Sequence, residues 1–125
     1  MHFSRLVLAF LLLPVAAPAA AAWMPAVTFL QKADALRARG PLALLSRDLK
    51  LLQAEAENAG DQLHAEHVAR VREHGPLEYC PPANRKLLAP RELIDGLHAI
   101  SPAELGRLDI KQAMHAILVR NYPCC

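Results

Sequence analysis

Apolar residues recur at helical spacing along most of the chain after its first 22 residues, and no stretch alternates in the manner of a β-strand. The clearest pattern lies in segment 41–75, where apolar residues step by four and three positions: Leu45, Leu49, Leu52, Ala56, Ala59 and Leu63. Such steps place side chains on one face of a helix. We expect this helix to begin at Pro41 or to be capped at Ser46, and to end at His74-Gly75-Pro76.

A shorter helix precedes this segment. Thr28 and Gln31 fit a capping box, in which both side chains satisfy free amides of the first turn, so we expect the helix to begin at Thr28. Its apolar stripe consists of Phe29, Leu30, Ala33 and Leu36. Gly40 and Pro41 end it, because glycine suits the position after a helix and proline does not continue one.

Three more helix starts follow in the C-terminal half. The segment 90–100 carries an inward stripe of Leu93, Ile94 and Leu97. Ser101 and Glu104 flank a proline and form a cap. Asp109 and Gln112 form another, which opens a helix with the core face Ile110, Met114, Ile117 and Leu118. The patterns together predict an all-α fold, a small bundle of four to five helices.

The first 22 residues do not show the amphipathic pattern of the rest of the chain. Arg5 is followed by an apolar run over 6–19, which is too short for a stable membrane span, and then by small residues around Ala20 to Ala22. This layout is typical of a secretory signal peptide, residues 1–22, with cleavage before Trp23. An uncleaved anchor helix is the alternative. After cleavage we expect a single helical domain over 23–125 and no further membrane span.

Export changes how the three cysteines are interpreted, because cysteines outside the cytoplasm normally pair. Cys124 and Cys125 are adjacent and so cannot readily bond to each other. Cys80 is therefore expected to pair with Cys124 or with Cys125, and Cys124, which directly follows Pro123, is favoured. Such a bond would staple the bundle.

Cys125 then remains as an odd thiol. It is either a mobile terminal thiol, free or capped, or the site of an intermolecular disulfide that would make a homodimer.

Charge excludes one class of partner. Without Arg5 the chain has 13 basic and 12 acidic side chains, and the basic residues form no block. Nucleic-acid binding usually needs a clustered cationic face, so we expect none.

Candidate catalytic and metal-binding residues have plainer explanations. His64 and His67 share a helix face, and His74 lies about two turns further on, but a polar helix face explains them better than a metal site does. Asp48 and Glu55 are spaced as an acid–base pair on a solvated helix. We therefore expect no catalytic residues, no metal and no cofactor, that is, a protein that is not an enzyme.

The C-terminal half resembles a known family. "YCPP", the amphipathic "RELIDGLHAI", the turn "SPAEL", the helix "IKQAMHAILVRNY" and the terminal "PC" are similar to the small exported immunity proteins that neutralise peptidoglycan amidases of type VI secretion. The resemblance covers Tyr79 to Cys124. It implies a helical exported fold and a disulfide between Cys80 and Cys124, with Tyr122 and Pro123 in the tail. Members of the family usually carry another cysteine pair in the N-terminal half, which has no counterpart here.

The resemblance implies a function. We expect an exported, non-enzymatic helical protein, periplasmic or secreted, that binds and inhibits a protein partner such as a peptidoglycan amidase effector. The alternative is a periplasmic stress or chaperone-like protein, whose five histidines beyond the leader would make it more cationic in acid.

Overall fold

The computed structural model describes residues 22–82 and 88–124. The signal peptide expected over 1–22 falls outside these ranges except for its last residue, and Cys125 lies outside them too. The described chain forms five α-helices and one 3-10 segment: α1 (Ala26–Arg39), η1 (Gly40–Leu45), α2 (Arg47–Arg72), α3 (Pro90–Ala99), α4 (Pro102–Leu105) and α5 (Ile110–Asn121). No strand occurs in these ranges, so the expected all-α fold is confirmed.

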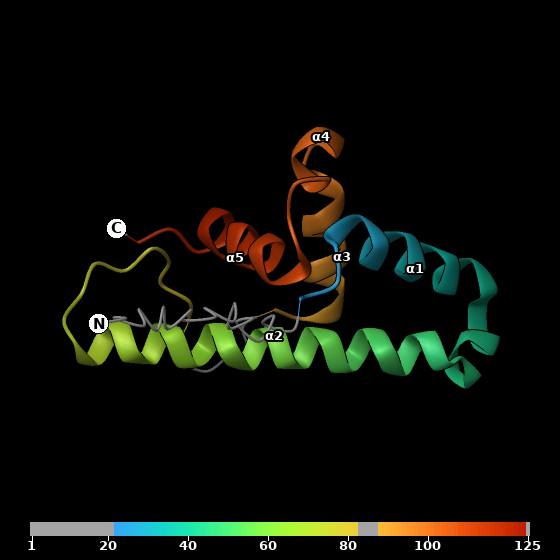
Figure 1. Cartoon of the computed structure of the whole chain (residues 1–125), viewed down its shortest axis with the longest axis horizontal. Helices are drawn as coiled ribbons and strands as arrows, with labels where there is room; N and C mark the ends of the chain where they lie inside the picture. The colour runs from blue at the N-terminus through green and yellow to red at the C-terminus, as the bar shows by residue number, and fades with distance from the viewer. Residues whose placement is uncertain (1–21, 83–87, 125) are drawn as a thin grey trace, which may run out of the picture.

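Helix α2 runs along the longest dimension of the molecule, and both α1 and α5 pack against it (Figure 1). Helix α3 packs against both α5 and α1. The four longer helices and the short α4 share one core, whose most completely buried large side chains are Leu97, Ile110 and Leu118. The periodic stripes of the sequence supply most of this core, as expected for amphipathic helices.

The caps in the C-terminal half are those that the sequence predicts. The Ser101 hydroxyl accepts a hydrogen bond from the Glu104 amide at the start of α4. Asp109 and Gln112 form a reciprocal capping box at the start of α5. These caps satisfy amides that have no partner within the helix.

The start of α1 differs from the prediction. The helix begins at Ala26 and not at Thr28, which lies inside it, and no side chain caps it. The reason is a backbone bridge: the Ala26 amide donates to the Leu108 carbonyl at 3.0 Å, and the Ile110 amide donates to the Met24 carbonyl at 2.8 Å. This pairing with a distant segment sets where the helix begins.

The segment between α1 and α2 also departs from the simplest prediction. Of the two expected starts, α2 uses Ser46, whose hydroxyl accepts a hydrogen bond from the Asp48 amide. Leu45 therefore precedes the helix and is 86% exposed, although the spacing assigns it to the buried stripe. Gly40, with φ of 63°, ends α1 in a conformation that favours glycine.

Candidate functional site

A shallow groove lies between α3 and α5 and has a volume of about 520 Å³. Small and apolar residues line it: Gly96, Ala99, Ile100, Ala116 and Ile117. The two helices approach closely at Gly96 in this groove, where an added Cβ would lie 2.7 Å from Ile117 Cδ1. The hollow is large enough for a side chain or a short segment of a partner.

Charged side chains of both signs stand around this floor. Arg91, Asp95 and Arg120 are exposed, and Glu92 is half-buried. Glu92 is held in place by Tyr122, whose hydroxyl donates to both carboxylate oxygens at 2.9 and 3.1 Å. An apolar floor with a charged rim is the general anatomy of a protein-binding surface.

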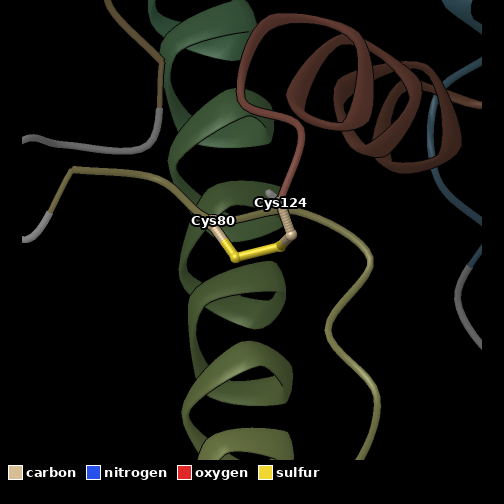
Figure 2. The surroundings of a disulfide bond; sticks show 2 residues. All are labelled: Cys80 and Cys124. Carbon is tan, nitrogen blue, oxygen red and sulfur yellow. A yellow bond between two sulfur atoms is a disulfide. The ribbon is translucent and has the colours of Figure 1, made fainter.

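The tail that carries Tyr122 is tied down by a disulfide. Of the two expected pairings, the structure contains Cys80–Cys124, with Cα atoms 5.0 Å apart. Figure 2 shows this bond joining the connection after α2 to the tail after α5. The Cys80 amide also donates to the Tyr122 carbonyl at 2.8 Å. The bond therefore fixes the tail, whose Tyr122 holds Glu92 of the groove, to the connection after α2.

A second cluster lies where α2, α5 and the connection after α2 meet. Tyr79 is buried, stacks on His67 with ring centroids 4.9 Å apart, and meets His115 edge-on at 5.7 Å. Its hydroxyl donates to the Leu63 carbonyl at 3.2 Å. The neighbouring Glu78 pairs with Arg70 at 2.7 Å and with His115.

This cluster alters two pKa values. Desolvation opposes the shift at Glu78, but the hydrogen bond from Arg70 and the charge of His115 together hold the pKa of that carboxyl below its usual value. Burial, aided by the charges of Glu66 and Glu78, raises the pKa of the Tyr79 hydroxyl. The hollow beside these groups is only about 30 Å³, roughly one water molecule, so the cluster is better suited to joining helices than to holding a substrate.

The sequence candidates for chemistry do not come together. His64 is exposed, His67 packs on Tyr79, and His74 follows the end of α2. Among the described residues no group of three or more histidine, cysteine or carboxylate side chains is arranged to hold a metal.

The two carboxylates spaced as an acid–base pair also have separate partners. Asp48 accepts from Lys32 at 3.5 Å, and Glu55 accepts from the Met24 amide at 2.7 Å. Both therefore help to fasten α2 to neighbouring parts of the chain.

Sequence reasoning missed the residues that shape both hollows. Gly96 is a single glycine within a helical pattern, but this signal does not predict close packing, because Gly60 of α2 is placed in the same way and has room for a Cβ. Glu78 and Tyr79 stand in an irregular connection, and His115 belongs to another helix, so no local pattern links them.

Comparison with models of known protein families, with curated proteins and with solved structures finds no match to this chain. Of the helices in the described part of the chain, none has both the length and the hydrophobicity needed to cross a membrane.

Proposed function

We propose that this chain is an exported, non-enzymatic helical protein that binds and inhibits a protein partner, and that the partner is a peptidoglycan amidase effector. The groove between α3 and α5 supports the proposal most directly. All of its lining residues lie between Ala89 and Asn121, within the half of the chain that resembles the immunity-protein family.

The groove suits a segment of folded protein better than a free small molecule. It is open and shallow, and its rim combines Arg91 and Arg120 with Glu92 and Asp95. A partner that carries charges of both signs around an apolar side chain would complement this groove. Complementary charge mainly determines which partner binds.

Inhibition of peptidoglycan hydrolysis tests this proposal. Type VI peptidoglycan amidases, beginning with any that is encoded beside this gene, are mixed with the oxidised, processed chain, and the clearing of a peptidoglycan suspension is followed. We expect near-stoichiometric inhibition of one of them. The variant Ala99→Arg fills the groove with a long side chain and should need about tenfold more protein or worse, the usual cost of a clash in an interface.

The matched control is Ala54→Arg, which adds the same side chain at an exposed alanine of α2 outside the groove. It should inhibit like the unmodified chain. Amidases that all stay fully active with the unmodified chain contradict the function, whereas equal inhibition by both variants contradicts only the choice of surface.

Export is part of the same proposal. The mass of the protein recovered from the periplasm or the medium should correspond to a chain that begins at Trp23 and has lost two hydrogens at the Cys80–Cys124 bond. A chain that keeps its first 22 residues and stays in the cytoplasm would contradict it.

A further inference from the structure

Three leucines stand out of the molecule on η1. Leu42 and Leu44 are each 73% exposed and Leu45 is 86% exposed, whereas Ala43 turns inward and packs on the core. With three residues per turn, a 3-10 segment aligns Leu42 with Leu45 and leaves Leu44 on the adjoining side. These leucines, which we call the leucine tip, are the most exposed large apolar side chains in the described residues.

Basic residues flank the leucine tip on both sides along the chain, although they are spaced apart and form no continuous block. Arg37 and Arg39 end α1 just before it, and Arg47 and Lys50 follow at the start of α2. All four are exposed, and within the described ranges none of them pairs with a carboxylate. Asp48 is the one acidic residue between Arg37 and Lys50, and Lys32 already faces it at 3.5 Å.

This arrangement makes the charge of the chain strongly uneven. The 14 residues from 37 to 50 hold four basic side chains and one acidic one, which leaves nine basic and eleven acidic side chains to the rest of the chain beyond Ala22. The tip is thus apolar and cationic on a molecule that is otherwise slightly acidic.

The tip also protrudes. In Figure 1, η1 lies at one end of the long α2 helix, where the chain reverses direction between α1 and α2. The C-terminus lies toward the other end of α2. Helix α2 has 26 residues, so these ends are separated by about 39 Å at the rise of an α-helix. Contact through the tip would leave the tail and its disulfide free.

We propose that the leucine tip inserts into the interface of an anionic phospholipid surface. Apolar side chains that enter the boundary between headgroups and acyl chains, ringed by cations that face anionic lipid, are the features of interfacial membrane binding. The leucines supply the first feature and the four basic side chains the second.

The exposed area favours lipid over a second copy of the chain. Three leucines at these exposures present on the order of 400 Å², about half of what each partner buries in a stable protein–protein interface. Four positive charges would also face each other across a symmetric dimer, which is unfavourable.

Vesicle sedimentation tests the proposal with the oxidised, processed chain. We expect it to pellet with mixed phosphatidylcholine–phosphatidylglycerol vesicles, to stay in solution with pure phosphatidylcholine vesicles, and to be released by high salt, which screens the attraction. Replacing the tip by L42S/L44S/L45S should weaken partitioning by about a hundredfold or more, from the apolar surface removed.

Two further variants make the test specific. R37Q/R39Q/R47Q should weaken binding to anionic vesicles by about a hundredfold, because each cation adds to the attraction. The control V71S/L77S/V119S removes three exposed apolar side chains away from η1, at 48%, 37% and 38% exposure, and should bind like the unmodified chain. Circular dichroism establishes that each variant keeps its helices.

Several outcomes would overturn the proposal. Equal binding to neutral and anionic vesicles would show that the basic side chains do not contribute to binding. Binding to neither kind of vesicle would show that the tip does not bind a phospholipid surface. A chain that elutes as a dimer and becomes a monomer in the leucine variant would show that a second copy covers the tip. Binding of the tip to an acidic protein but not to vesicles would identify a protein partner instead.

Discussion

At the scale of single residues, Gly96 shows how little space the packing leaves. A Cβ there would lie 2.7 Å from Ile117 Cδ1 and 2.8 Å from both Cγ1 and Cγ2. Because three atoms of a buried, branched side chain are involved, no rotation of Ile117 clears all of them. We expect Gly96→Ala to lower the free energy of unfolding by about 1–2 kcal/mol, the cost of overpacking less the helix propensity gained.

Gly60→Ala is the matched control in the same assay, urea denaturation followed by circular dichroism. A Cβ at Gly60 meets only Met114 Cε, at an ordinary 3.7 Å. This variant should be more stable by up to about 1 kcal/mol, since alanine is the better helix former. Equal effects at the two glycines would show that the approach of α3 to α5 is not as close as the structure has it.

The lowered pKa of Glu78 predicts a dependence of stability on pH. A carboxyl whose pKa is lower in the folded than in the unfolded chain contributes stability above its unfolded pKa, and this contribution is lost as the pH falls through the folded pKa. Glu78→Gln should therefore be less stable than the unmodified chain at neutral pH, and the difference should shrink below about pH 4. Because Glu78 is 43% exposed, the effect is small.

Thermal melts at several pH values check this prediction. Glu57→Gln removes the same charge from an exposed position of α2 that has no ion pair in the described part of the chain. Its difference from the unmodified chain should not vary with pH in the same way. Parallel curves for the two variants would argue against a special role of the Arg70–Glu78–His115 contacts.

Among the secondary-structure elements, some helix starts are set by a cap within the same turn, and others by a segment far away in the chain. Asp109→Ala removes the capping box of α5 and should cost about 1 kcal/mol of unfolding free energy. Thr28→Ala should cost almost nothing, because Thr28 lies inside α1 although its sequence context resembles a cap. Urea denaturation of both variants measures this, and an equal loss at Thr28 would favour the helix start that the sequence predicts.

Most elements could be predicted because their signals lie within a few residues. Ser46, Ser101 and Asp109 cap the helices that follow them. The groove could not be predicted in this way, since its floor combines Gly96 of α3 with Ala116 and Ile117 of α5, which are about 20 positions away. Its shape depends on the crossing of the two helices, and spacing along one helix says nothing about that.

At the scale of the whole molecule, the disulfide closes a loop with a sequence separation of 44 residues. Cys80→Ser/Cys124→Ser should lower the free energy of unfolding by about 4 kcal/mol, because the unfolded chain regains the freedom that the bond removes. Urea denaturation measures the loss, and mass spectrometry of the thiols verifies the pairing.

Cys125→Ser is the control for this variant. The residue lies outside the described ranges, and its replacement leaves Cys80 and Cys124 to pair. We expect no change in unfolding. If Cys125→Ser destabilised the chain as much as the double variant, the pairing would have to be reassigned to Cys125.

The helical class, most of the caps and the stripes that form the core follow from the order of the residues, because these features depend on periodicity and on contacts within one turn. Three other features follow from the packing of the helices: α1 begins at Ala26, Tyr79 is buried between two histidines, and the leucine tip stays exposed. Each of these depends on segments far apart in the chain. A leucine has the same local signature whether a distant helix covers it or not, so burial is settled only when the helices pack.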